Sequence, residues 1–399
     1  MSMEQRKIDV VLFRILFLLA AGIVVVQPLG FSGLTSYMFL LTFPLTVFLW
    51  IRSVRKTLTG TDLLVISVVA LAALNVLINA SVTGVMPGFS YIKKLIMFVV
   101  TLLFLQMAYR VRVDKNMIRF VNIVVDFLTV YFILMYFTQN VRMFTLNGRV
   151  SAYLTFCFSN PNLTGLFLTC LYMLELYRLF SPEKWYWKVI HIIMACFLAF
   201  FVWQTDSRNC LLVMTLFTGI CAWLVFRGHR QMRIGKLWAA IISAFPMLFL
   251  VAYMAFVYTP WVQNTFDFLV GEGKNLDSRM RIWGPAMNQL AASPLIGAYS
   301  QISKGTGMSQ MHNTHLDVAC SYGIPVLILF CVLIWNYLNQ KDRCYTEKAS
   351  FIYILGFACA IMLGIGEAAL VSGGLGLYIF IGTFLILANH TREESDSKL

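Results

Sequence analysis

The sequence predicts an all-α fold: a polytopic integral membrane protein with about 12 transmembrane helices and one large extracytoplasmic loop between spans 9 and 10. Composition is the first observation behind this prediction, since 59% of the 399 residues are hydrophobic and only 12% are charged. Soluble domains average roughly 45–50% apolar and about 25% charged residues. The second observation is a series of apolar runs. A helix needs about 20 mostly apolar residues to cross the hydrocarbon core, and these runs approach that length.

The apolar runs follow one another along the whole chain, so we expect a single transmembrane domain over residues 1–399. Turn-forming residues such as Pro28, Pro87 and Pro182 separate several of them. The first run is too long for a signal peptide and lacks a cleavage site of small residues, so we expect it to remain as a span. The predicted spans lie near residues 11–29, 33–51, 62–80, 92–110, 117–138, 162–180, 187–205, 209–226, 237–257, 316–338, 349–367 and 370–388.

Basic residues predict the orientation, because the cytoplasmic loops of membrane proteins carry an excess of Lys and Arg. With the N-terminus inside, 22 of the 31 basic residues fall in cytoplasmic segments and nine fall on the other face. This distribution places both termini in the cytoplasm. The net charge of +13 then follows from topology, with membrane lipids as its counter-charge, and indicates no nucleic-acid partner.

One connection is much longer than the others. Residues 258–314 form an extracytoplasmic loop between the ninth and tenth spans, and loops of that length are usually functional or disordered. The glycines and aromatic residues of this loop, together with an amphipathic stretch at residues 279–290, argue against disorder. Pro285 predicts a kink or a restart in this helix. A helix that simply lies in the membrane interface is the alternative interpretation.

Arginines on the outer face are informative, because the charge bias of membrane proteins disfavours them there. Arg208 follows Asp206 in the tight connection between spans 7 and 8, and Arg279 and Arg281 follow Asp277 in the long loop. One interpretation is interfacial snorkelling or pairing with these aspartates. The other is a phosphate clamp, because guanidinium groups bind phosphate oxygens in a bidentate manner and remain charged.

A histidine stands where the tenth span begins. Thr314 and Asp317 have the spacing of a capping box, which predicts a helix start there and leaves His312 just outside it. An imidazole of ordinary pKa, about 6.5, can act as a general base near neutral pH. His315 could join His312 in binding a metal, but no third ligand is nearby. The nine cysteines include no CxxC pair, so we expect no metal site.

Four short stretches occur in a fixed order: Ser159-Asn160-Pro161-Asn162-Leu163-Thr164-Gly165, then Thr205-Asp206-Ser207-Arg208, then Arg279-x-x-x-Trp283 with Pro294-Leu295-Ile296-Gly297, and finally His312-Asn313-x-x-Leu316 with Tyr322-Gly323-Ile324-Pro325. With the predicted span layout, they resemble the motifs of the O-antigen ligase and polymerase superfamily, which assembles bacterial envelope polysaccharide. The resemblance covers roughly residues 155–330. The chain departs from the family at Gly284-Pro285, where its members have a continuous helix.

The resemblance implies a metal-independent glycosyltransferase without a cofactor, located in the bacterial cytoplasmic membrane. Its donor would be an undecaprenyl-pyrophosphate-linked glycan. His312 is then the expected base, and Arg208 with Arg279 or Arg281 would hold the pyrophosphate, because preorganised charge stabilises a leaving group. The other residues expected to bind substrate are Asn313, Arg149, Arg142, Trp283, Asn160 and Asn162. A flippase and a chain-length regulator are the expected protein partners.

The resemblance leaves two activities open. A polymerase adds repeat units to another lipid-linked glycan, whereas an O-antigen ligase transfers the glycan to lipid A core or another acceptor. We favour the polymerase, because the ligase is one branch among many polymerases.

The residues themselves leave two further classes open. A lipid-linked sugar flippase or transporter would use buried charges such as Asp126 and Glu175 to line a path. However, Glu175 can pair with Arg178 one turn later, and no internal repeat is visible. A structural or regulatory membrane protein would tolerate substitution of His312.

Overall fold

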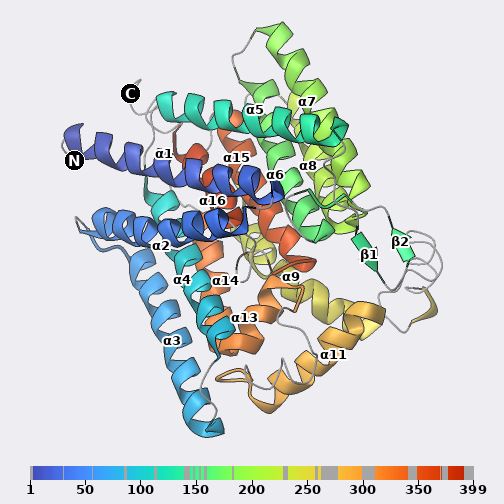
Figure 1. Cartoon of the computed structure of the whole chain (residues 1–399). Coiled ribbons are helices and arrows are strands. Elements are labelled where there is room, and N and C mark those ends of the chain that lie inside the picture. Colours follow the sequence, from blue (N-terminus) through green and yellow to red (C-terminus); the bar gives the residue numbers. More distant parts are fainter. Residues whose placement is uncertain are drawn as a thin grey trace.

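The computed structural model describes residues 3–29, 31–55, 57–84, 88–111, 115–138, 144–146, 149–151, 154–156, 160–181, 184–227, 232–256, 259–261, 277–298, 311–339, 348–368, 370 and 376–390. These residues are almost entirely helical, as predicted (Figure 1). The α-helices are α1 (Met3–Val26), α2 (Ser32–Val54), α3 (Gly60–Thr83), α4 (Phe89–Arg110), α5 (Lys115–Phe137), α6 (Pro161–Leu176), α7 (Trp185–Gln204), α8 (Arg208–Phe226), α9 (Lys236–Phe256), α11 (Asp277–Ala292), α13 (Thr314–Tyr322), α14 (Ile324–Leu338), α15 (Lys348–Met362) and α16 (Leu377–His390). Short 3₁₀ helices are η1 (Gln27–Leu29), η2 (Tyr177–Phe180) and η3 (Leu363–Ile365). The strands β1 (Phe144–Leu146) and β2 (Arg149–Ser151) form an antiparallel hairpin.

Nine of the described helices, α1 to α9, are long and apolar enough to cross a membrane. The prediction of a polytopic membrane protein is confirmed to this extent. Within these nine, α4 and α6 are the inner helices, because 72% and 78% of their spans are buried by the rest of the protein. The corresponding share is between 22% and 39% for the others, which leave apolar side chains on the outside, where lipid would cover them.

The three remaining predicted spans differ from the structure. The tenth, at 316–338, consists of two helices, α13 and α14, that meet at Gly323. The eleventh is α15 followed by η3, and the twelfth begins at Leu377, directly after the left-handed Gly376. The apolar helices in this part of the chain have 10–17 residues each. The break at Gly323 has a physical cause, since the amide of Ile324 donates to the carbonyl of Pro294 outside the helix.

Two glycines with a positive φ lie at this break, and each packs against the backbone beside the other. Gly297 has a φ of +79° and Gly323 a φ of +90°, which only glycine adopts without strain. A Cβ on Gly297 would lie 2.6 Å from the carbonyl oxygen of Cys320, and a Cβ on Gly323 would lie 2.6 Å from the carbonyl carbon of Leu295. The Ala298 amide also donates to Cys320 at 2.9 Å. The third and fourth motif stretches therefore meet through their backbones.

Two asparagines of α3 hold this junction from the side. The Asn75 amide donates to the carbonyls of Leu295 and Tyr322, at 3.1 and 2.6 Å. The Asn79 amide donates to the carbonyls of Ile296 and Gly297, at 2.8 and 3.1 Å. Buried carbonyls outside helices need such donors in a membrane protein, because no water reaches them. This is why two polar residues lie buried within a membrane-spanning helix.

In Figure 1 the hairpin and α11 lie at the right of the molecule, opposite the start of α1. The predicted loop at 258–314 contributes α11 to this side. Pro285 lies inside α11, which runs as one helix from Asp277 to Ala292, so the predicted restart is not observed. Residues 262–276 and 299–310 of the loop lie outside the described residues.

Candidate functional site

Arg208 is the first residue of α8, directly after the tight turn from α7. Asp206 in this turn has a φ of +53°, a left-handed conformation that non-glycine residues seldom adopt. The Nε of Arg208 lies 4.0 Å from Oδ1 of Asp206, and both side chains are more than one third exposed. An ion pair of this length and exposure is weak. The Arg208 side chain is partly exposed at the start of a helix.

The start of α6 packs against the same turn. Asn160 caps α6, with its Oδ1 accepting from the amide of Asn162 at 2.9 Å. One turn further on, a Cβ added to Gly165 would lie 2.9 Å from Cβ of Ser207. Glycine thus allows the close approach of α6 to the α7–α8 turn. The first two motif stretches are neighbours, and Asn160 has a structural role as a cap. Substrate binding by Asn160 and Asn162 stays a prediction.

His312 lies between α11 and α13 and has a φ of +49°. Its Nδ1 is 3.2 Å from each carboxylate oxygen of Glu367, which is almost fully buried. The His312 side chain itself is 24% exposed. An imidazole that contacts a buried carboxylate through one ring nitrogen and remains partly accessible can exchange a proton with a bound molecule. Glu367 was not predicted as a site residue.

Trp283 and Asn313 fix the backbone on either side of His312. The indole Nε1 of Trp283 donates to the carbonyl of Met311 at 2.9 Å, and its ring packs edge-on against Tyr253. Asn313 caps α13 by accepting from the Leu316 amide, so the cap is one residue earlier than the predicted Thr314. Both side chains are buried, at 1% and 0% exposure. A ring buried to this degree presents no face to a sugar, so Trp283 has a packing role in this structure instead of the expected contact with substrate.

A short segment after α15 links the starts of α8 and α13. The Asn209 side chain, next to Arg208, donates to the carbonyl of Leu363 at 2.9 Å, and Gly366 packs closely on the same side chain. At the other end of the segment, the Thr314 hydroxyl donates to the carbonyl of Glu367 at 2.9 Å. The second and fourth motif stretches therefore meet at residues 363–367. One feature of the sequence could have indicated this contact, because Glu367 is an acidic residue at the end of an otherwise apolar run.

The other cations predicted to bind substrate are Arg281, Arg279, Arg149 and Arg142. Arg281 is exposed on α11, two residues before Trp283. Arg279 lies in the first turn of α11 and Arg149 in β2, but their side chains lie outside the described part of the structure. Arg142 lies outside the described residues altogether. The helix α11 contacts α13, which places Arg281 on the element that supports His312.

His315 points away from His312. Its Nε2 lies 2.6 Å from the carbonyl of Ser243 in α9, and its ring packs on Phe330. The side chain is fully buried, so the structure gives no support to a metal site shared with His312. Behind these residues, Lys94 forms a buried ion pair with Asp317. Sequence reasoning missed this pair, because its partners are more than 200 residues apart.

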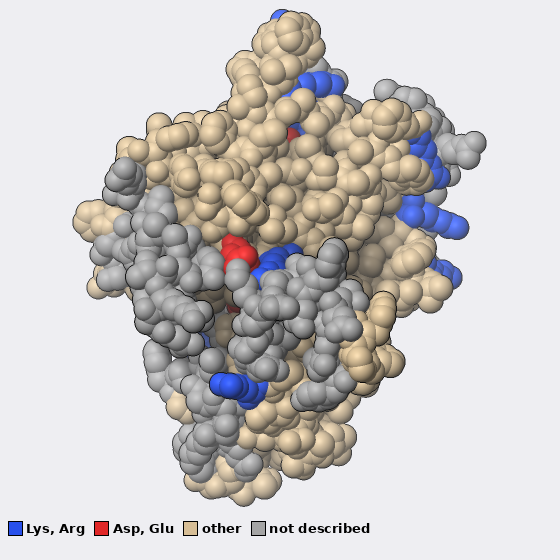
Figure 2. All heavy atoms as spheres, turned by 90° about the vertical axis from the view of Figure 1, so that its right-hand side faces the viewer, with Lys and Arg blue, Asp and Glu red and all other residues tan. Residues whose placement is uncertain are grey.

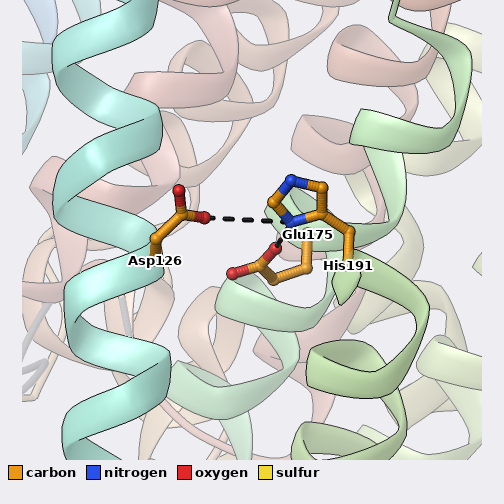
Figure 3. Close-up of side chains that lie close together, drawn as sticks. All are labelled: Asp126, Glu175 and His191. Atoms are coloured by element: carbon orange, nitrogen blue, oxygen red, sulfur yellow. Dashed lines mark hydrogen bonds and ion pairs between the residues drawn. The ribbon is translucent and has the colours of Figure 1, made fainter. Parts of the chain in front are cut away.

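A second polar cluster lies between α5, α6 and α7, and Figure 3 shows its side chains pointing toward one another. The Nδ1 of His191 is 2.8 Å from Oε2 of Glu175 and 3.9 Å from Oδ1 of Asp126. Such a group could hold a metal ion by geometry. The expected partner of Arg178 was Glu175, but the contact found is with Asp126, at 3.1 Å. Thr129 also donates to Glu175.

Contacts among the protein's own groups account for this cluster. Arg178 lies 3.1 Å from Oδ1 of Asp126, and His191 and Thr129 both contact Glu175. We therefore interpret the cluster as a polar network that joins α5, α6 and α7.

Figure 2 shows the face to the right of Figure 1, where acidic and basic side chains lie next to each other near the centre of the view. No family model matches the chain, and no curated protein is significantly similar to it in sequence. The fold and the nine apolar helices define the class, a polytopic membrane protein.

Proposed function

We propose that this chain is a membrane glycosyltransferase of the O-antigen ligase and polymerase superfamily. It polymerises undecaprenyl-pyrophosphate-linked repeat units into polysaccharide at the outer face of a bacterial cytoplasmic membrane. The observation that carries this proposal is the meeting of the Arg208 turn and His312 at residues 363–367. Arg208 and His312 are about 100 positions apart in the sequence, so only the folded chain brings the turn and the histidine to the same segment.

Backbone strain supports a functional role for the same region. Among the described residues, the non-glycine residues with a positive φ are Phe156, Asp206 and His312. All three lie in or beside the motif stretches. A left-handed conformation costs about 1–3 kcal/mol for such residues and persists only where the surroundings enforce it, often at active sites.

The residues suit glycan transfer from a lipid pyrophosphate. The acceptor hydroxyl oxygen bonds to the anomeric carbon, and its proton passes to His312. The bond between that carbon and the phosphate oxygen breaks, with both electrons going to the pyrophosphate. Arg208 stabilises the charge on this leaving group, and Arg279 or Arg281 adds a second guanidinium from α11. His312 afterwards releases its proton to solvent, which restores the starting state.

The start of α8 adds a further favourable contribution. Ser207 precedes the helix without a side-chain capping bond, and the N-terminus of a helix favours an anion. The helix dipole also favours negative charge at this end. A pyrophosphate bound by Arg208 would lie near these amides.

A reconstituted assay tests the proposal. The purified protein in proteoliposomes receives an undecaprenyl-pyrophosphate-linked oligosaccharide whose distal sugar carries a fluorophore, and the products are separated by length. We expect a ladder of longer lipid-linked glycans, which His312→Ala reduces to a small residual amount. Arg227→Ala is the matched control for Arg208→Ala, because Arg227 follows the opposite end of α8, where it stacks on Trp223.

The alternatives give different products in the same assay. Transfer to added lipid A core without a ladder would indicate a ligase. Movement of the labelled lipid between leaflets without any new glycosidic bond would indicate a flippase, and the buried cluster of Figure 3 is the feature that keeps this rival open. Normal ladder formation by the His312→Ala variant would show that His312 is not the catalytic base.

A further inference from the structure

We infer that Glu367 is a positioning residue that orients the His312 imidazole and stabilises its protonated form during transfer. This inference rests on the proposed function. Glu367 lies in neither of the motif stretches that contain Arg208 and His312, and it comes from a different part of the chain. Its carboxylate reaches Nδ1 of His312 through both oxygens, each at 3.2 Å.

The buried carboxylate determines which nitrogen of His312 can act as the base. A carboxylate only accepts hydrogen bonds, so the contact requires the proton of a neutral imidazole to be on Nδ1. Nε2 then carries the lone pair that accepts the proton of the acceptor hydroxyl. When Nε2 becomes protonated, the positive ring lies beside a negative carboxylate that is only 3% exposed. Weak screening at such a buried position strengthens this attraction.

The backbone around Glu367 is held so that the carboxylate cannot easily move away. The Thr314 hydroxyl donates to the Glu367 carbonyl, and Gly364 packs closely on the Thr314 side chain. The Asn209 side chain donates to Leu363, four residues earlier. The same contacts that link the starts of α8 and α13 to residues 363–367 thus also fix Glu367.

The protein contains its own matched control, the Glu175–His191 pair of Figure 3. Glu175 is buried, and its Oε2 lies 2.8 Å from Nδ1 of His191. Glu175→Gln and Glu367→Gln therefore both remove a buried carboxylate from an imidazole. The two substitutions should lower thermal stability to a similar degree, and only Glu367→Gln should change the chemical step.

The test measures kcat and KM for glycan transfer with the reconstituted protein. We expect Glu367→Gln to lower kcat by about 10²–10⁴-fold, the range for general acid–base catalysis, with KM changed by less than about threefold. Glu367→Asp keeps the charge and should recover at least about a tenth of the wild-type kcat. Glu175→Gln should stay within about threefold of wild type.

A double-variant cycle separates positioning from a merely structural role. If Glu367 acts through His312, the variant with both His312→Ala and Glu367→Gln should have the same residual kcat as His312→Ala alone. A further loss in the double variant, or a kcat for Glu367→Gln close to wild type, would overturn the inference while leaving the proposed function intact. A wild-type protein that forms no glycosidic bond would instead overturn both.

Discussion

Replacing Gly323 by alanine should destabilise the protein strongly, and the cost can be estimated from the junction between α13 and α14. Gly323 has a φ of +90°, where an L side chain is strained. An added Cβ would also overlap the carbonyl oxygen of Leu295 and lie 2.6 Å from its carbonyl carbon. These are backbone atoms that Asn75 holds in place, so they cannot rotate away.

Gly84 provides the matched control for the conformational part of this cost. It ends α3 with a φ of +63°, and no atom of the described chain lies within 4 Å of an added Cβ. Gly84→Ala should therefore cost only the left-handed penalty, about 1–2 kcal/mol. Gly323→Ala adds the steric overlap, for a total of about 3–5 kcal/mol, which is in the exceptional range for a single substitution.

Thermal unfolding in detergent, followed by tryptophan fluorescence, measures the difference between these two variants. At roughly 2 °C per kcal/mol, we expect Tm to fall by about 6–10 °C for Gly323→Ala and by about 2–4 °C for Gly84→Ala. Equal shifts in the two variants would refute the reasoning, because they would mean that the backbone contact between Gly323 and Leu295 contributes nothing.

Three further predictions concern the charged groups. Arg208→Lys should lower glycan transfer by at least about tenfold, because an ammonium cannot form a bidentate contact with phosphate, whereas Arg227→Lys should have little effect; equal activity of the two variants would argue against a phosphate clamp. Lys94→Met leaves Asp317 buried without its partner and should cost about 3–5 kcal/mol in unfolding free energy, much of which the double variant Lys94→Met/Asp317→Leu should recover. Unfolding measurements on the single and double variants check this, and additive losses would contradict it. Glycan transfer should persist after treatment with EDTA, as measured in the reconstituted assay; a loss restored by added divalent ions would indicate a metal requirement.

The sequence alone was sufficient to predict the fold class. Apolar length is a local property, because a helix that crosses the hydrocarbon core must satisfy its own backbone. The nine long helices, α1 to α9, therefore appear where the runs predicted them. The same reasoning failed at 316–338, because hydropathy does not register a break such as the one at Gly323. That break depends on an amide, Ile324, whose acceptor is Pro294, 30 residues away.

The candidate site was predictable only in part. The motif stretches single out Arg208 and His312 by sequence, since charged and ionisable residues are unusual beside apolar membrane-spanning runs. Sequence patterns also suggested Trp283 and Asn313 as substrate contacts, but the structure buries both as supports of the backbone beside His312. A residue type and its motif position do not determine which way a side chain points.

Tertiary structure alone decided the partners of the buried charges. The sequence predicted that Glu175 would pair with its neighbour Arg178, whereas the contacts of Glu175 are with His191 and Thr129, and Arg178 reaches Asp126 on another helix. Glu367 could not be assigned to His312 from the sequence, because 55 residues separate them. Membrane insertion depends on the composition of each segment by itself, so the sequence reveals it. The pairing of charges depends on which helices pack together, and only the folded protein brings those helices into contact.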